Sequence, residues 1–237
     1  MRAMILAAGR GERMRPLTDS TPKPLLKAGG KSLIAWHIER LVQAGITQIV
    51  INHAWLGPQI EEQLQDGRQF GANIAYSAEH QALETAGGIA QALPLLGHEP
   101  FLVINGDIWC DWDPGQAAQI AQRLVQQQKL AWLLLTDNPP HHGTGDFVLG
   151  NDNIVTDKAN VQPDQPPALT FTGIGIYQPA LFQTLNRGRP APLAPLLRHS
   201  MLQKEVIGTH YNGCWIDVGT PQRLASLDLA LQEQRTP

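Results

Sequence analysis

The chain has 237 residues, of which 43% are hydrophobic and 16% are charged, and its formal net charge is −3. This length predicts one domain with a sizeable core, and the mild negative charge argues against a nucleic-acid partner. The sequence shows no apolar run long enough to span a membrane and no signal peptide. Its two cysteines are too few for a disulfide scaffold. We therefore expect a cytoplasmic protein that does not enter a membrane.

The first 137 residues alternate between short apolar segments and amphipathic ones. A strand is predicted over 3–8, and Ser32 is expected to cap a helix that Gly45 ends. Further strands are predicted at 48–52, 72–77, 101–107 and 130–136, and further helices at 57–66, 85–96 and 114–128. Such alternation predicts an α/β fold with a doubly wound, mostly parallel sheet.

The pattern changes after residue 137. Residues 138–168 contain paired prolines and a predicted hairpin, which indicates a small antiparallel insertion over one end of the sheet. The hairpin strands are predicted at 147–149 and 154–156, later strands at 170–177, 205–211 and 214–220, and helices near 179–186 and 195–203. A last helix begins at Thr220-Pro221 and places Leu224, Leu227 and Leu231 on one stripe.

Residues 6–30 form a glycine-rich, basic connection between the first strand and the first helix. Residues 1–31 hold seven Lys/Arg side chains against two acidic ones, although the whole chain is acidic. In an open α/β sheet, ligands bind at the carboxyl ends of the strands, and the first strand-to-helix connection is a favoured place. Glycine backbone N–H groups and basic side chains bind anions there, so this loop is predicted to bind phosphate.

Two standard phosphate loops do not fit this segment. GKS at 30–32 matches the end of a P-loop, but Leu25 stands where the first glycine is required. Gly9 and Gly11 match the start of a dinucleotide fingerprint, but Met14 occupies the third glycine position. The connection is also much longer than a usual βα loop, which favours a functional role of another kind.

The same loop resembles the signature of the sugar-1-phosphate nucleotidylyltransferases, with LAAGRGERMRPLT at 6–18 and PKPL at 22–25. Further segments that resemble the family follow in its order: LETAGGI at 83–89, NGD at 105–107, TGIGIY at 172–177 and WIDVGT at 215–220. The resemblance covers nearly the whole chain and implies a Rossmann-like, GT-A-like nucleotidyltransferase domain. It implies a nucleotide-binding core at 1–137, a mainly sugar-binding part at 138–220, with the insertion covering the sugar site, and a C-terminal helix at 221–237.

The reaction implied by this resemblance joins a nucleoside triphosphate (NTP) and a sugar 1-phosphate. The phosphate of the sugar attacks the α-phosphorus of the triphosphate, and pyrophosphate leaves. Since two polyanions must meet, positive charge and backbone donors held in advance are needed. The resemblance assigns catalysis to Arg13, Lys23 and Asp107, and nucleotide contacts to Ala8, Gly9, Gly11, Glu12, Arg13, Lys23, Glu84, Thr85 and Gly87.

Mg²⁺ is the cofactor that the resemblance implies, with Asp107 and Asp217 as its ligands. This ion takes hard oxygen ligands and typically binds through one or two carboxylates together with substrate phosphates. The sugar 1-phosphate is expected to contact Asn105, Asp146, Thr172, Gly173 and Glu205. His141 and His142 are expected to be exposed loop residues, since no third ligand stands at a spacing typical of a metal site.

The sequence leaves the base open. Glu79 and Glu84 stand where many thymidylyl- and uridylyltransferases of the family carry Gln and Gly, and LETAGG has relatives among mannose-1-phosphate guanylyltransferases. NPPHHGTGDF at 138–147 and HYNGCWIDVGT at 210–220 resemble the uridylyltransferases that act on N-acetylmuramic acid 1-phosphate in bacterial cell-wall recycling. This resemblance favours UTP and that sugar phosphate.

Four alternatives stay open. Two keep the reaction: a mannose-1-phosphate guanylyltransferase and a glucose-1-phosphate uridylyl- or thymidylyltransferase. A phosphocholine cytidylyltransferase would need an aromatic choline cage, and residues 138–175 offer only Phe147 and Phe171. A nucleotide-sugar sensor without catalysis would be expected to have lost one of the catalytic residues. The oligomeric state is also open, and a monomer is compatible with the sequence.

Overall fold

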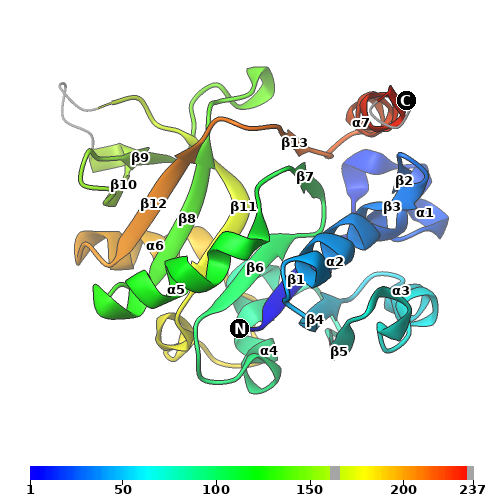
Figure 1. Cartoon of the computed structure of the whole chain (residues 1–237), viewed down its shortest axis with the longest axis horizontal. Coiled ribbons are helices and arrows are strands. Elements are labelled where there is room, and N and C mark those ends of the chain that lie inside the picture. Colours follow the sequence, from blue (N-terminus) through cyan, green and yellow to red (C-terminus); the bar gives the residue numbers. More distant parts are fainter. Residues whose placement is uncertain (161–165, 234–237) are drawn as a thin grey trace.

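A seven-stranded mixed sheet forms the centre of the protein, in the order β12-β8-β11-β6-β1-β4-β5 (Figure 1). The structure is a computed structural model that describes residues 1–160 and 166–233. The strands are β1 (Ala3–Ala7), β4 (Gln48–His53), β5 (Asn73–Ala78), β6 (Phe101–Asn105), β8 (Ala131–Thr136), β11 (Thr170–Tyr177) and β12 (Val206–Tyr211). Only β11 runs antiparallel to its neighbours within this sheet. The predicted α/β fold with a mostly parallel sheet is confirmed.

Helices cover both faces of the sheet because its strands are apolar on both sides. In β1, Ile5 belongs to one core and its neighbour Met4 to the other. Figure 1 shows α2 (Leu33–Gln43) and α5 (Ala117–Gln126) in front of the sheet, and α4 (Glu84–Leu96) and α6 (Leu193–Leu202) behind it. Near the β5 edge, α3 (Gly57–Leu64) adds buried leucine and isoleucine side chains to the front core. Packing of these two cores on the sheet fixes the parallel strands, so that their carboxyl ends lie together at one edge of the sheet.

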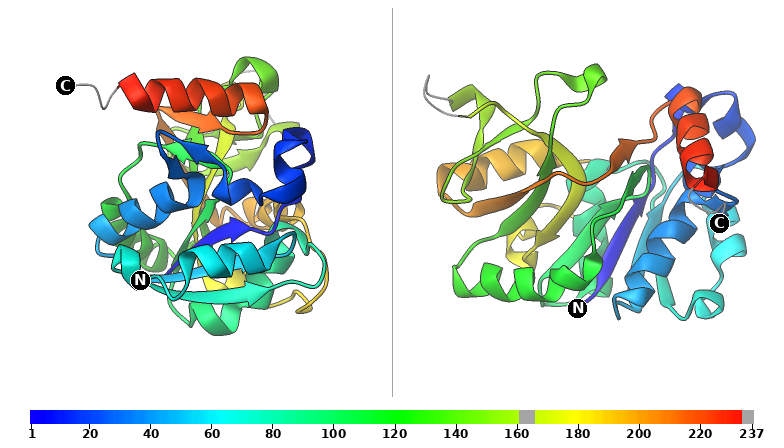
Figure 2. Two further views of the ribbon diagram at one scale, coloured as in Figure 1. Left: turned by 90° about the vertical axis from the view of Figure 1, so that its right-hand side faces the viewer. Right: turned by 45° about the horizontal axis from the view of Figure 1, so that its top comes forward.

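A third, smaller core joins the two ends of the chain. It contains Met14, Ala28, Leu33, Val218 and Leu227, together with other buried side chains. Helix α7 (Pro221–Glu233) packs against β2 (Lys27–Ala28), which pairs with β3 (Lys31–Ser32), and Asp228 Oδ1 accepts a hydrogen bond from the Gly29 backbone N–H (2.7 Å). Figure 2 shows this C-terminal helix, drawn in red, beside the N-terminal segment, drawn in blue.

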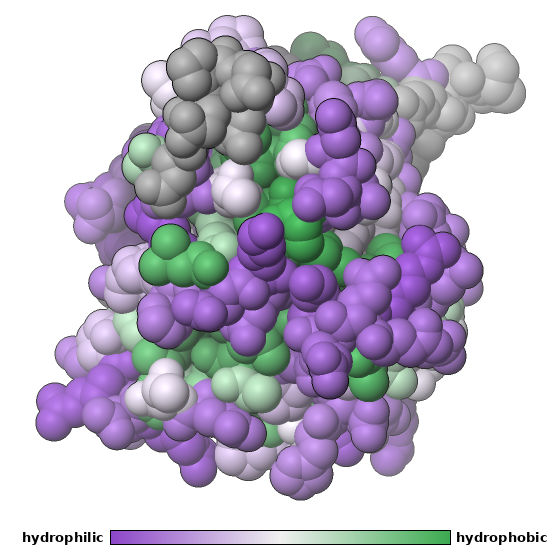
Figure 3. All heavy atoms as spheres, turned by 90° about the vertical axis from the view of Figure 1, so that its left-hand side faces the viewer, coloured by the Kyte–Doolittle hydropathy of each residue, from purple (hydrophilic) through white to green (hydrophobic). Residues whose placement is uncertain are grey.

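The second half of the sheet carries the predicted insertion. Strands β9 (Phe147–Leu149) and β10 (Val155–Asp157) form the expected antiparallel hairpin. Residues 161–165 of the insertion lie outside the described residues. On this side of the molecule the surface is mostly hydrophilic with scattered apolar areas (Figure 3). No helix in the described ranges is long and apolar enough to cross a membrane.

Several predicted boundaries differ from the structure. The helix expected near 179–186 is only a short 3₁₀ turn, Pro179–Phe182. Ser32 does precede α2, but its side chain makes no capping hydrogen bond. The strand predicted over 101–107 ends at Asn105, and the chain turns into β7 (Ile108–Cys110), which pairs antiparallel with the short β13 (Trp215–Asp217). Neither this pairing nor the strand β7 follows from local sequence, since both depend on a partner distant in the chain.

The third core makes a prediction for α7. Leu227 is 1% exposed, whereas Leu229 on the same helix is 61% exposed. Leu227→Ala should lower the free energy of unfolding by about 2–5 kcal/mol, because it opens a cavity between α7 and the N-terminal loop. Leu229→Ala should change it by less than about 0.5 kcal/mol. Urea denaturation of both variants measures the difference, and equal losses would show that α7 is not anchored as described.

Candidate active site

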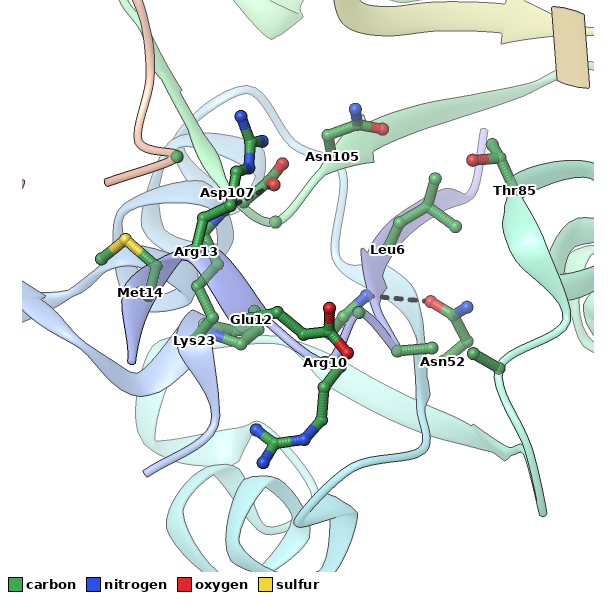
Figure 4. Close-up of a pocket in the computed structure, with 18 of the residues that line it drawn as sticks. Leu6, Arg10, Glu12, Arg13, Met14, Lys23, Asn52, Thr85, Asn105 and Asp107 are labelled. Atoms are coloured by element: carbon green, nitrogen blue, oxygen red, sulfur yellow. Dashed lines mark hydrogen bonds and ion pairs between the residues drawn. The ribbon is translucent and has the colours of Figure 1, made fainter. Parts of the chain in front are cut away.

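A cavity of about 620 Å³ opens at the carboxyl ends of β1 and β6 (Figure 4). Three segments line most of it: residues 6–14 of the N-terminal loop, the start of α4 near Thr85, and the turn at 105–107 after β6. Lys23 and Gly219 complete the wall at the far end. A cavity of this size is typical of a small-molecule site, and its place at the strand ends agrees with the general rule for open α/β sheets.

The N-terminal loop lines the cavity with backbone because of its glycines. Gly11 has a φ of 69°, a left-handed conformation that other residues rarely adopt. A Cβ there would also lie 3.0 Å from the Thr18 methyl carbon and 3.3 Å from Lys23 Cβ. Within the described residues, nothing lies within 4 Å of the place where a Gly9 Cβ would stand. A ligand can therefore approach the loop backbone closely.

The same loop returns Lys23 to the cavity. The short 3₁₀ turn Lys23–Leu25 begins after Pro22 and includes Pro24, and its Lys23 side chain is only 9% exposed. Lys23 Nζ donates to Asp107 Oδ2 at 2.7 Å. This ion pair fixes an ammonium group at the end of β6, where Asp107 is still 41% exposed to a ligand.

Asp107 is held against β1 by the glycine before it. The Gly106 N–H donates to the Leu6 carbonyl (2.8 Å), and a Cβ on Gly106 would lie 2.6 Å from that oxygen. Any larger residue would therefore push the turn away from β1. The glycine in NGD is required by this close backbone approach.

The strand pair β7–β13 brings Asp217 beside the turn that carries Asp107, although Asp217 itself is not among the residues that line the cavity. Asp217 pairs with Ile108, and the Val218 N–H donates to the Asp107 carbonyl at 2.9 Å. Asp217 Oδ2 accepts a hydrogen bond from Arg223 Nη1 (2.7 Å) and lies 3.6 Å from His141 Nε2. One carboxylate thus lines the cavity and the other lies beside its turn, and each is in an ion pair with a basic side chain.

The donor set fits Mg²⁺ bound jointly by protein and substrate. In the described part of the chain, Asp107 Oδ1 and Asp217 Oδ1 accept no hydrogen bond from the protein. Those residues also contain no cluster of three or more acidic, His or Cys side chains placed to hold a metal. Mg²⁺ typically uses one or two carboxylates and completes its shell with phosphates and water, which is what two such aspartates offer.

A buried hydrogen-bond network supports the other end of the cavity. Asn52 accepts from the Ala7 N–H (3.0 Å) and donates to Glu79 Oε1 (2.7 Å), while Glu79 Oε2 accepts from the Leu83 N–H (2.8 Å). Burial raises the pKa of Glu79, and the hydrogen bonds from Asn52 and Leu83 oppose that rise. Asn52 lines the cavity and Glu79 lies behind it. A Cβ on Gly88 would lie 2.7 Å from Glu79 Oε1, so this glycine makes room for the network.

Most of the predicted nucleotide contacts do line the cavity, namely Ala8, Gly9, Gly11, Glu12, Arg13, Lys23, Glu84 and Thr85. Gly87 does not. Its N–H donates to the Ala191 carbonyl (3.0 Å), and a Cβ on Gly87 would lie 2.5 Å from the Arg189 carbonyl oxygen. Gly87 therefore allows close packing between α4 and the segment at 189–191, and its nucleotide contact stays a prediction.

The predicted sugar-side residues fall into distinct environments. Asn105 lines the cavity, and Gly173 packs beside it, since a Gly173 Cβ would lie 2.5 Å from Asn105 Nδ2. Thr172 is fully buried and donates to the Leu134 carbonyl (2.8 Å). Asp146 accepts from the Phe171 N–H (2.9 Å) and lies 3.0 Å from His142 Nε2. Thr172 thus shapes the sheet, while Asp146 holds the 138–146 loop on β11.

Glu205 is not part of the site. It immediately precedes β12, and its carbonyl accepts from the Leu130 N–H (2.8 Å) before β8 begins. Because β12 and β8 are parallel, Glu205 stands at their amino ends, at the opposite edge of the sheet from the cavity. The expected sugar contact is therefore corrected. Strand direction decides at which edge of the sheet Glu205 lies, and a single glutamate next to a predicted strand does not indicate that direction.

The sequence pattern does not predict Asn52 or Arg223 as neighbours of the site, and it predicts His141 only as an exposed loop residue. Asn52 bridges β1 to Glu79, and Arg223 and His141 contact Asp217. His141 is half-exposed, with 43% of its side chain accessible, but it is not an isolated loop histidine. Arg223 lies in the first turn of the last helix, and no local pattern distinguishes it from a solvated surface residue.

The fold and the site together define a nucleotide-transferring enzyme of the α/β class, and the chain belongs to the nucleotidyl transferase family, which it matches over residues 2–234. It is 57% identical to the N-acetylmuramate alpha-1-phosphate uridylyltransferase of Neisseria meningitidis serogroup B, over 94% of this chain and 95% of the relative. The enzyme of the same name from Caulobacter vibrioides is 34% identical, over 98% and 97% of the two chains.

A solved structure agrees in fold. A protein of Bacillus anthracis assigned as a glucose-1-phosphate thymidylyltransferase, crystallised with a sucrose, superposes with a TM-score of 0.83. It covers 98% of this chain and 96% of its own, at 21% sequence identity. This likeness supports the architecture of the whole chain, including the half that carries the insertion.

Buried His37 beneath β7 makes a pH prediction. Burial lowers its pKa from 6.5 to about 4, although a hydrogen bond with the Ile108 backbone favours protonation. The unfolded chain therefore binds this proton more readily, and stability falls as the pH drops from 6.5 to 4, by up to about 3 kcal/mol. Denaturant unfolding across this range should show a flatter pH profile for His37→Gln than for the wild type. The exposed His98→Gln control should keep the wild-type slope, and a wild-type slope in both variants would refute the assignment.

Proposed function

We propose that the protein is an Mg²⁺-dependent uridylyltransferase that joins UTP to N-acetylmuramic acid α-1-phosphate, in the cytoplasmic recycling of cell-wall sugar. The choice of substrates is carried by the identity of 57% to a relative of that name, which extends over nearly the full length of both chains. The chemistry is supported by Lys23 and Asp107, which form an ion pair at the wall of a nucleotide-sized cavity.

The reaction brings two polyanions together, and the residues of the cavity meet that difficulty directly. An oxygen of the sugar phosphate attacks the α-phosphorus of UTP, a new P–O bond forms, and the bond to the pyrophosphate oxygen breaks. Backbone N–H groups at 8–11 and the side chain of Arg13 face the triphosphate, and Arg13 balances the charge that pyrophosphate gains. Lys23 stands at Asp107, where the two phosphates meet.

Asp107 and Asp217 are the residues that would hold Mg²⁺, through carboxylate oxygens that accept no hydrogen bond from the described residues. When bound, this ion would neutralise phosphate charge. The remaining tasks belong to the chain itself: the glycine loop positions the triphosphate, Asn105 offers an amide to the sugar, and the Asn52–Glu79 network keeps β1 in register with α4.

A guanylyltransferase acting on mannose 1-phosphate is the second candidate, because LETAGG at 83–88 resembles that group as well. A grid of the four triphosphates against several sugar 1-phosphates, followed by pyrophosphate release, separates the two. We expect UTP with N-acetylmuramic acid α-1-phosphate to be among the best pairs. A preference for GTP with mannose 1-phosphate would replace the proposal, and binding without turnover in the presence of Mg²⁺ would favour a sensor.

The two aspartates make a prediction about rate. Asp107→Asn or Asp217→Asn should lower turnover at least about 10²-fold, the scale of losing one preorganised charged group. Asp66→Asn, which removes a carboxylate in a surface ion pair with Arg68, should leave turnover unchanged. Steady-state kinetics with circular dichroism measures rate and fold together. Near-normal turnover in either active-site variant would remove that residue from the proposed metal site.

A further inference from the structure

Arg223 lies where three distant segments meet. It belongs to the first turn of α7, and 22% of its side chain is exposed. One nitrogen, Nη1, donates to Asp217 Oδ2 (2.7 Å) and to His141 Nε2 (2.7 Å). Since the guanidinium has N–H donors and no acceptor, Nε2 of His141 is the acceptor in this contact. His141 therefore helps to orient the guanidinium of Arg223.

Arg223 and Arg13 approach the same point of the cavity wall. Gly219 lines the cavity, and a Cβ on it would lie 2.5 Å from Arg223 Nη2, 3.0 Å from Asp217 Oδ1 and 3.1 Å from Arg13 Nη2. The Arg13 side chain has neither an ion pair nor a hydrogen bond to any other residue that the structure describes. Two like charges that approach one point repel each other unless an anion accompanies them, and in the structure that anion is the Asp217 carboxylate, which is already paired with Arg223. A pair of guanidinium groups facing one glycine is suited to a phosphate, which both can bind in a bidentate manner.

The neighbours of Arg223 indicate which phosphate this is. Arg13 belongs to the loop that faces the triphosphate, whereas His141 belongs to the 138–146 loop, which Asp146 holds on β11 in the second half of the chain. Arg223 stands between these two parts, beside Asp217. We propose that Arg223 binds the phosphate of the sugar 1-phosphate and that His141 is the positioning residue that aims it. This assignment rests on the proposed function, in which a sugar 1-phosphate is the second substrate.

The contact with Asp217 then has a definite role before the substrate binds. Without a phosphate, the carboxylate neutralises the guanidinium and keeps it at the cavity wall. If Asp217 held Mg²⁺ as proposed, Arg223 would keep its contact with His141 and would be able to bind the phosphate. Removing Arg223 should therefore weaken binding of the phosphate without weakening binding of the metal. If Arg223 served only as a structural partner of Asp217, its removal would leave phosphate binding unchanged.

Calorimetric titration without metal tests this directly, because no turnover occurs. The probes are the best sugar 1-phosphate from the substrate grid and, separately, pyrophosphate. Arg223→Ala should bind the sugar 1-phosphate about tenfold or more weakly than the wild type, the scale of a lost charge-assisted contact, with pyrophosphate affinity changed less than about threefold. The affinity of Arg223→Lys for the sugar 1-phosphate should lie between those of the wild type and Arg223→Ala, because lysine keeps the charge. Arg68→Ala should bind it as tightly as the wild type.

His141 supplies the second measurement. His141→Ala should raise the KM for the sugar 1-phosphate with little change in kcat, and His141→Gln, whose amide oxygen can accept from Arg223, should restore part of the loss. Wild-type sugar-phosphate binding in Arg223→Ala would overturn the proposal, and a loss confined to pyrophosphate would move Arg223 to the leaving group. Failure of the wild type in the substrate grid, by contrast, would contradict the proposed function itself.

Discussion

The antiparallel pairing of β7 with β13 is the constraint on which the site depends. It joins a turn after the fourth strand of the core to a segment near the end of the chain, and the Val218 N–H on the Asp107 carbonyl fixes the register. Through this register Asp217 comes beside the turn that carries Asp107. Without it, the Asp107 carbonyl would lose its contact with Val218, and Asp217 would have no defined place beside that turn.

The N-terminal connection is long because it has to reach the turn that carries Asp107 as well as cover the cavity. Its first part must cover the cavity with backbone, and its second part must return Lys23 to Asp107. Met14 is fully buried in the third core and anchors the loop between these two tasks, on the same cluster that receives α7. The loop and the last helix therefore stabilise each other, and both ends of the chain contribute to one site.

The parts that the sequence predicts well are those encoded locally. Apolar runs and glycine stops predict β1, β4, β6 and most helices, because burial on both faces of a sheet leaves a signature within one segment. Motifs likewise predict Lys23 and Asp107 as site residues. The features that the sequence does not predict depend on contacts between segments distant in the chain. Glu205 lies at the edge of the sheet opposite the cavity, because strand direction is set by pairing. Gly87 packs against residues 189–191, which come a hundred positions later. The sequence does not predict the position of Arg223 for the same reason, since its contacts are with a distant loop and with Asp217.

Charge balance explains why the carboxylates and cations of this site come in pairs. Lys23 is nearly buried, and an unpaired ammonium there would be costly, so Asp107 compensates it in the absence of substrate. Asp217 does the same for Arg223. Under the proposed function, a metal would replace these cations as the partner of the carboxylates, and phosphates would replace the carboxylates as partners of the cations. Each charged side chain would then keep a partner of opposite charge when the substrates bind.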